Sequence, residues 1–207
     1  MKITFKTPND NQVHTYCPGC LQDGTLRSQR PSGKLVYRCT ACAYVGPRAL
    51  IIDPAINWWV DSQREYWHET AGIFIHNHRG EFLFFERMAF PFGLTPPAGH
   101  VDRGEQPAQS ARRELREETT VNLPASAFRL LATDDIRGDQ CRRGADIHRW
   151  HSFVCAIPKG ATIQVDPREG SRPVWLTLEQ VLKASPTPAT RYVITRHTRQ
   201  LAAAAQG

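Results

Sequence analysis

The sequence carries most of its information in one stretch, GHVDRGEQPAQSARRELREETTV at residues 99–121. We expect a helix in its second half, because Pro107 suits the first turn, where its missing N–H costs little. A helix turns by about 100° per residue, so Glu114, Glu117 and Glu118 project from one broad face. Three carboxylates this close would repel one another on a bare helix. Hard oxygen ligands in such a group favour a divalent cation, Mg²⁺ or Mn²⁺.

The loop before this helix is predicted to be tied to it by Arg113. This arginine lies one helical turn before Glu117 and can also reach back to Glu105. A guanidinium can bind a carboxylate through two parallel hydrogen bonds, which would hold the loop against the helix. Gly99 and Gly104 permit the sharp backbone that a metal-binding loop requires.

These residues resemble the signature of the Nudix hydrolase family. Its pattern is Gly, five residues, Glu, seven residues, Arg-Glu, an aliphatic residue, any residue, Glu-Glu, any residue, Gly and an aliphatic residue. The sequence departs from the fixed positions once, because Thr120 stands where the family has Gly. That Gly lies near the helix end, where a left-handed residue is common and a β-branched one is disfavoured. Either the helix ends differently here or its backbone is less demanding.

The resemblance implies an α/β fold, the Nudix α/β/α sandwich, over residues 68–185. It also implies metal-dependent hydrolysis of the pyrophosphate bond in a nucleoside diphosphate linked to another moiety, with release of a mononucleotide. On this basis Glu114, Glu117 and Glu118 are metal ligands or the base, the Gly99 carbonyl is a further ligand, and Arg113 and Glu105 orient the site.

Further acids and a cation are expected near the same site. A carboxylate outside the signature often completes a Nudix site, and three acids lie in loops that could reach it: Asp139, Asp146 and Glu169. Glu169 precedes a Trp-bearing strand, which favours it. Arg87, at a predicted strand end, could reach a phosphate.

Two cysteine pairs predict a small zinc ribbon at the N-terminus. The pairs read CPGC and CTAC, and together they supply Cys17, Cys20, Cys39 and Cys42. This spacing is typical of a structural Zn²⁺ site, with a hairpin around Pro31-Ser32-Gly33 between the pairs. A unit of about 50 residues has too small a core to fold well alone, so the metal would stabilise it. A dithiol redox pair is the alternative. Cys155 is expected to be inert and Cys141 could be reactive.

The whole chain divides into four parts in this interpretation. The ribbon occupies 1–47, a Trp-rich connector 48–67, the Nudix domain 68–185, and a C-terminal helix and tail 186–207. The connector carries Trp58, Trp59 and Trp67, which we expect to pack the ribbon onto the main domain or to form a homodimer interface. Strands are predicted at 71–76, 81–87, 128–136 and 148–157 and from 174, and helices at 177–183 and 191–204. Residues 88–98 are predicted to be irregular.

Composition sets broad limits on partners and location. The chain has 207 residues, a net charge of +6 and a pI of about 9.2, which favours anionic ligands such as nucleotides or nucleic acid. No apolar run approaches the roughly 20 residues of a membrane span, and the first residues lack the apolar core of a signal peptide. A cytoplasmic protein without a membrane partner is therefore expected.

The substrate stays open at this level. The order of ribbon and signature is similar to that of the zinc-containing NADH pyrophosphatases, but the stretch SQPWPFP that those enzymes carry downstream is missing here. One alternative is a nucleic-acid-binding regulator with a ligand-sensing Nudix domain, whose ribbon would meet phosphates through Arg27, Arg30, Lys34 and Arg38. Others are a hydrolase of RNA 5′ ends and a module that only binds a protein.

Overall fold

The computed structural model describes residues 1–31 and 34–206, so the predicted turn at Pro31-Ser32-Gly33 lies partly outside the described residues. Its main element is an eight-stranded mixed sheet with the order β11-β12-β7-β8-β13, in which β6 and β10 also pair with β7, and β9 with β8. The strands are β6 (Trp58–Val60), β7 (Tyr66–His76), β8 (Phe82–Arg87), β9 (Leu94–Thr95), β10 (Ala98–His100), β11 (Arg129–Arg137), β12 (Ile147–Ala156) and β13 (Gly170–Leu176). Strands β7 and β12 run parallel at its centre.

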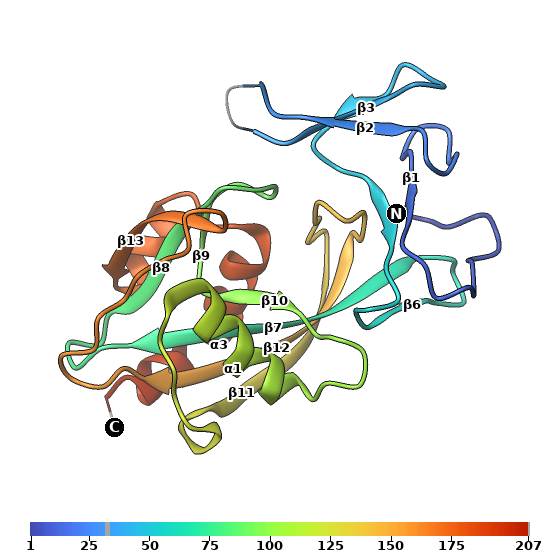
Figure 1. Cartoon of the computed structure of the whole chain (residues 1–207). Helices are drawn as coiled ribbons and strands as arrows, with labels where there is room; N and C mark the ends of the chain where they lie inside the picture. The colour runs from blue at the N-terminus through green and yellow to red at the C-terminus, as the bar shows by residue number, and fades with distance from the viewer. Residues whose placement is uncertain (32–33, 207) are drawn as a thin grey trace.

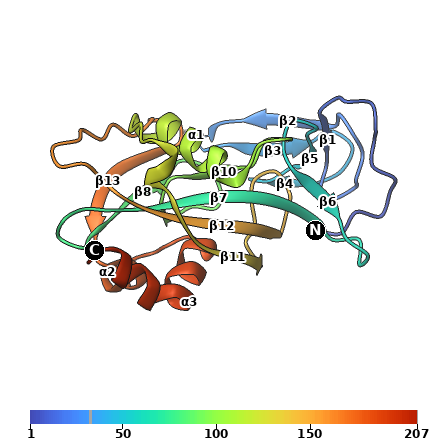
Figure 2. The ribbon, with the colours of Figure 1, turned by 90° about the horizontal axis from the view of Figure 1, so that it is seen from below.

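Helices cover both faces of this sheet, as Figure 2 shows from the edge. Helix α1 (Pro107–Thr119) lies on one face, and α2 (Leu178–Lys183) and α3 (Pro188–Ala204) lie on the other. The predicted α/β/α sandwich is therefore confirmed. None of the described helices is both long enough and apolar enough to cross a bilayer.

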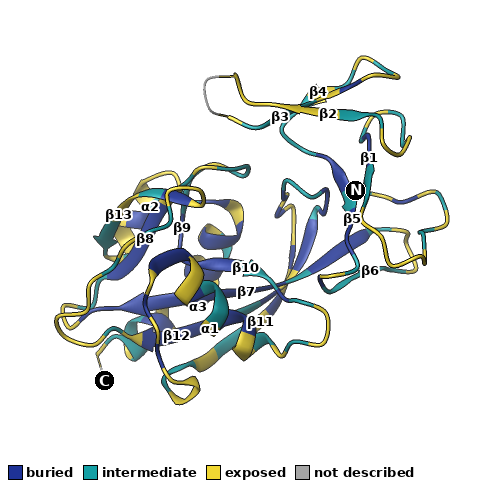
Figure 3. Ribbon diagram, viewed as in Figure 1, coloured by how far each residue is buried: buried dark blue, intermediate teal, exposed yellow. Residues whose placement is uncertain are grey.

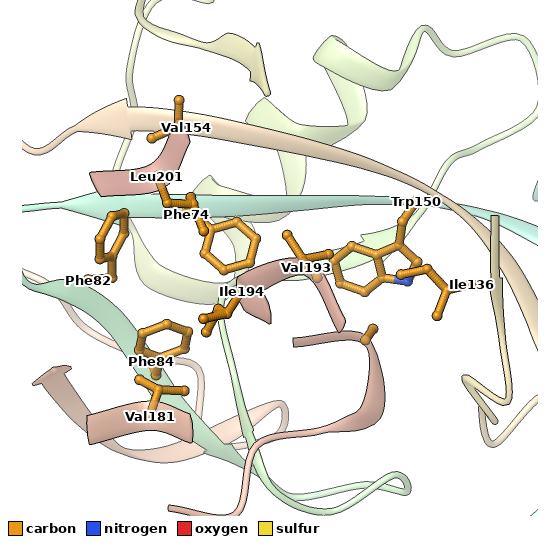
Figure 4. Packing of buried hydrophobic residues seen from close by; sticks show 12 residues of the cluster. Phe74, Phe82, Phe84, Ile136, Trp150, Val154, Val181, Val193, Ile194 and Leu201 are labelled. Carbon is orange, nitrogen blue, oxygen red and sulfur yellow. The ribbon is translucent and has the colours of Figure 1, made fainter. Parts of the chain in front are cut away.

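Alternation along β7 builds two cores. Ile73 and Ile75 pack with α1 through residues such as Leu115. Phe74, between them in sequence, points the other way and packs with Val193 of α3. Successive strand residues face opposite sides of a sheet, so one apolar strand serves both layers. Figure 4 shows the second core, where aromatic rings from β7, β8 and β12 meet aliphatic side chains of α2 and α3.

The N-terminal unit stands apart from the sandwich in Figure 1. It contains a three-stranded sheet of β2 (Leu26–Gln29), β3 (Val36–Cys39) and β4 (Val45–Gly46), and a pair formed by β1 (His14–Tyr16) and β5 (Leu50–Ile52). Figure 3 shows that β2 and β3 are mostly exposed or half-buried, whereas the central strands of the sandwich are buried. A third cluster, including Tyr16, Leu50 and Tyr66, joins this unit to the sandwich.

Several predicted limits differ from the structure. Strand β7 begins at Tyr66, inside the connector assigned to 48–67, because its first residues pair with β6. Strand β5, which follows residue 47, pairs with β1. The segment 88–98 is not wholly irregular, since β9 and the start of β10 lie in it.

Helix α3 begins at Pro188, three residues before the predicted start, because Thr187 caps it by accepting from the Thr190 N–H. Its apolar side belongs to the core of the sandwich. Trp58 packs in the cluster that joins the two units, and Trp59 stacks on Trp67 at 5.5 Å between ring centroids. Packing of these rings onto the sandwich agrees with the expectation for the connector.

Candidate active site and cysteine centre

Helix α1 begins and ends within the signature stretch. Gln106 and Gln109 form a reciprocal capping pair at its start, and Pro107 occupies the first turn. Thr120, the residue that caps the C-terminal end of α1, has φ 62°, the left-handed conformation that favours glycine. Its N–H donates to the Arg116 carbonyl over 3.0 Å. The backbone therefore keeps the shape of the family pattern although the residue is β-branched. Strain at Thr120 is the cost of this substitution.

Arg113 links the loop, the helix and a strand. Its Nε and Nη2 donate to the two oxygens of Glu105 over 3.2 and 2.9 Å, the paired geometry expected from the sequence. Nη1 donates to Glu114 Oε1 over 2.6 Å and lies 3.4 Å from Glu117 Oε2, and Nη2 also donates to the His100 carbonyl over 3.1 Å. One guanidinium thus fixes three acidic side chains relative to β10.

Gly99 is required by close contact with Glu114. A Cβ built on Gly99 would lie 2.1 Å from the Glu114 carboxyl carbon and one of its oxygens. Because no Cβ is present, the carboxylate lies directly against the backbone of β10. This contact brings the Gly99 peptide and the Glu114 carboxylate close enough together to share one cation.

The three helix glutamates differ in exposure. Glu118 is buried and accepts from the Ala98 N–H over 2.8 Å, whereas the Glu117 side chain is half exposed. Burial raises the pKa of Glu114 to about 7, although Arg113 opposes the shift. Burial also raises the pKa of Glu118 well above its usual range, and the neighbouring Glu114 adds to this effect. Two acids, one buried and one largely covered, whose charged forms are disfavoured fit a site that gains a divalent cation.

These acids line a cavity of about 460 Å³. Glu169 and Asp139 line the same cavity, but Asp146 does not, because it pairs with Arg48 Nη2 at 2.5 Å. Positive side chains share the lining: Arg87, Arg113, Arg142, Arg143 and Arg168. Arg143 pairs with Asp53 and Arg168 with Asp166, whereas Arg87 and Arg142 have no carboxylate within 4 Å among the described residues. The cavity therefore combines acids with arginines that are free to meet an anion.

The four predicted ribbon cysteines converge although they come from two separate turns. Cys17 Sγ lies 3.6 Å from Cys42 Sγ, and Cys20 Sγ lies 3.8 Å from Cys39 Sγ. All four sulfur atoms lie within 4.8 Å of one another, and none is in a disulfide. In a tetrahedral site with Zn–S bonds of about 2.3 Å, the sulfur atoms would be about 3.8 Å apart. The spacing fits such an ion.

A second group of ligand-type side chains was not expected from the sequence. We call it the histidine–cysteine cluster, and its members are His68, His100, Cys141 and His148, with ligand atoms within 4.8 Å of one another. Cys141 is buried here rather than free to react in a loop. Strand register brings the group together, since His68 and His148 are direct partners in the parallel pair β7–β12. The available signal was histidine in otherwise apolar strands and directly after Gly99.

Comparisons with known proteins agree with this architecture. The family model of the NUDIX domain matches residues 66–197. The chain is 39% identical over 56 residues to the asymmetrical bis(5′-nucleosyl)-tetraphosphatase of Caenorhabditis elegans, a match covering 26% of this chain and 41% of that protein's length. Less than half of that curated relative is therefore spanned.

Solved structures show the same fold. A MutT protein from Methanosarcina mazei is 20% identical with a TM-score of 0.53, over 65% of this chain and 94% of that one. The Nudix hydrolase RenU from M. smegmatis is 18% identical with a TM-score of 0.52, over 71% of this chain and 94% of that one. Since the family model covers well over half of the sequence and the signature residues lie together at one cavity, the chain belongs to the NUDIX domain family.

Proposed function

We propose that this protein is a metal-dependent pyrophosphohydrolase that cleaves a nucleoside diphosphate linked to another moiety. The single observation that carries the proposal is the meeting of the buried Glu118 and the largely covered Glu114 with Glu117 and Glu169 at one arginine-lined cavity. Clustered carboxylates favour a divalent cation, and unpaired arginines favour phosphate. The cavity therefore offers both a cation site and phosphate-binding side chains, which hydrolysis of a pyrophosphate requires.

Each residue at the site receives a role in this proposal. The carbonyl of Gly99 and the carboxylates of Glu114, Glu117 and Glu118 would hold Mg²⁺ or Mn²⁺. When bound, such an ion neutralises phosphate oxygens and lowers the pKa of a bound water. Arg113 and Glu105 are positioning residues, because Arg113 donates hydrogen bonds to both Glu105 and Glu114 and so fixes a ligand carboxylate.

Other residues that line the same cavity would bind the substrate and transfer the proton. Arg87 and Arg142 would bind phosphate oxygens and so orient the anhydride bond. Glu169 lies in the loop before β13, outside the helix, and lines the cavity together with the three helix acids. We assign to it the proton of the attacking water. Hydrolysis then adds water across the P–O–P bond and releases a mononucleotide together with the remaining phosphorylated product.

Dinucleoside polyphosphates are the first substrates to test. The support is the similarity of this chain to a bis(5′-nucleosyl)-tetraphosphatase over 56 residues. The match does not extend over the rest of that protein. ADP-ribose, nucleotide sugars, NADH and capped RNA belong in the same panel. Turnover of capped RNA alone would favour the RNA 5′-end alternative.

The deciding experiment is a product screen over this panel with Mg²⁺ and with Mn²⁺. We expect metal-dependent release of a mononucleotide, and a loss of roughly 100-fold in Glu117→Gln, about 2.7 kcal/mol of transition-state stabilisation. Glu117 is half exposed, so this variant should fold normally. Glu179→Gln, which changes an exposed acid on α2, is the matched control and should keep full activity. Equal turnover by Glu117→Gln would remove this residue from the mechanism.

We further propose that the ribbon cysteines bind structural Zn²⁺, supported by the two sulfur–sulfur distances. The domain limits, the cytoplasmic location and a homodimer stay predictions. Nucleic-acid binding by Arg27, Arg30, Lys34 and Arg38 is also a prediction, and its test is the salt dependence of RNA binding.

A further inference from the structure

We propose that a second zinc centre lies in the wall of the substrate cavity, held by three imidazoles and one thiolate. Its ligands are the members of the histidine–cysteine cluster: His68, His100, Cys141 and His148. The site differs from the carboxylate site, although both border the same cavity, and it is separate from the ribbon cysteines.

Two of the distances between ligand atoms are close to the edges of a tetrahedral zinc site. His68 Nδ1 lies 3.0 Å from His100 Nε2, and Cys141 Sγ lies 3.6 Å from His68 Nδ1. With Zn–N bonds of about 2.0–2.1 Å and a Zn–S bond of about 2.3 Å, those edges would be about 3.3 and 3.6 Å. A shift of a few tenths of an ångström would admit the ion.

One histidine has the carboxylate partner that zinc ligands usually have. His148 Nδ1 lies 3.2 Å from Asp139 Oδ2, so Nε2 is the nitrogen left for a metal. Asp139 is itself held by the Trp150 Nε1–H over 2.9 Å. The two groups form an ion-pair contact without an aligned hydrogen bond, and a small turn of the ring on metal binding would let Asp139 accept from Nδ1, which fixes a ligand ring and raises its basicity. Asp139, a candidate for the further catalytic acid, acts through His148 in this assignment.

The backbone already holds all four residues in place. His148 and His68 pair directly on neighbouring strands, and His100 pairs with Thr70, which lies on the same side of β7 as His68. The loop that carries Cys141 is closed by its N–H, which donates to the Ala145 carbonyl over 2.9 Å. Arg48 Nε donates to the Cys141 carbonyl over 2.9 Å. Ligands on rigid strands and a braced loop are preorganised for an ion.

The chemistry of the donor set identifies the metal and its role. Imidazole and thiolate ligands select Zn²⁺ over Mg²⁺ and Mn²⁺, which prefer oxygen. Four protein ligands leave no open coordination position, which is typical of a structural site. Such an ion would cross-link β7, β10 and β12 to the loop 138–146, which brings Arg142 to the cavity. The centre would shape the phosphate-binding wall without joining the reaction.

Metal analysis of the whole protein tests the proposal without any substrate, so it is independent of the proposed hydrolysis. After dialysis against excess Mg²⁺ with a mild chelator, the native protein should retain two Zn²⁺ per chain. Cys141→Ser should retain one. Cys155→Ser is the matched control, because it removes another buried thiol outside the cluster, and it should retain two. Equal zinc content in Cys141→Ser and the native protein would overturn the proposal.

X-ray absorption at the zinc edge of the native protein covers the case in which Cys141→Ser does not fold. We expect a mixed shell of nitrogen and sulfur, because three imidazoles would join the thiolates. A shell of sulfur alone, with one Zn²⁺ per chain, would show that the cluster is only a buried hydrogen-bonded group. A mixed shell with one Zn²⁺ per chain would support the second centre and count against zinc in the ribbon.

Discussion

The ribbon and the α1 region both bring potential metal ligands together, but the hydrophobic cores that support them differ greatly in size. In the segment 17–46, Cys17 and Cys39 are the buried residues among those described. Helix α1 instead packs on a large sheet through Ala111 and Leu115, and its acids project from an apolar core. The same concentration of ligands therefore has two causes. In the ribbon a metal would replace a missing core, whereas at α1 the core holds acids in place for chemistry.

The largest effect is expected in the ribbon, when one of its metal ligands is removed. Cys42→Ser removes one thiolate, so the ribbon should lose metal and several kcal/mol of local stability. We expect fast amide hydrogen exchange in β2 and β3, with unchanged protection in β7. Cys155→Ser, which replaces a thiol outside the ribbon, should leave β2 and β3 protected. Unchanged exchange in Cys42→Ser would show that the ribbon folds without the metal.

The next test asks whether the position of the Glu114 carboxylate on α1 controls activity without affecting folding. In Gly99→Ala the new Cβ meets the end of the flexible Glu114 side chain, which can move away. Stability should change little, but displacement of the carboxylate should lower kcat by about 100-fold. Activity and thermal unfolding are measured together. In a Glu114→Ala background the same change should have almost no further effect, and full additivity would contradict the assigned contact.

The pH dependence of the metal-free protein tests the burial of the acids. The pKa of Glu114 is raised from 4.5 to about 7, so the folded chain binds more protons than the unfolded chain between these values. The free energy of unfolding should therefore fall as pH rises from 5 to 8, on the order of 1–3 kcal/mol. Urea unfolding in the presence of a chelator measures it. Glu114→Gln should flatten the slope, and a native protein that gains stability over this range would refute the assignment.

The smallest expected effect concerns the helix end. Thr120 is exposed and holds a left-handed backbone at φ 62°. Thr120→Gly should stabilise the protein by about 0.5–1 kcal/mol, because glycine adopts this conformation without strain. Thr120→Ala, which keeps a Cβ, should give a smaller gain. Denaturant midpoints measure both, and destabilisation by glycine would mean that the side chain compensates for the strain.

Local spacing explains why much of the site was predictable. Glu114, Glu117 and Glu118 share a helix, and Arg113 reaches Glu105 across one loop, so helix geometry alone relates them. The cysteine pairs are equally local, since each comes from one tight turn. Resemblance to the Nudix signature then supplied the fold, which the structure and the family model confirm.

The candidate acids outside the signature show where this reasoning ends. In the sequence Asp139, Asp146 and Glu169 were all loop acids, and Glu169 was favoured only because it precedes a Trp-bearing strand. In the structure Asp146 pairs with Arg48, Asp139 faces His148, and Glu169 shares the cavity with the helix acids. The path of each loop over the sheet decides among them, and no short pattern describes that path.

The sequence by itself determined the acidic helix, its arginine clamp and the two cysteine pairs, because each depends on residues that are close together in the chain. Only the tertiary structure decided that Glu114 lies against Gly99 and that His68 stands beside His148. These contacts depend on which strands pair and in which register. Strand pairing is set by the burial of two whole apolar faces, a property of the complete sheet rather than of any segment.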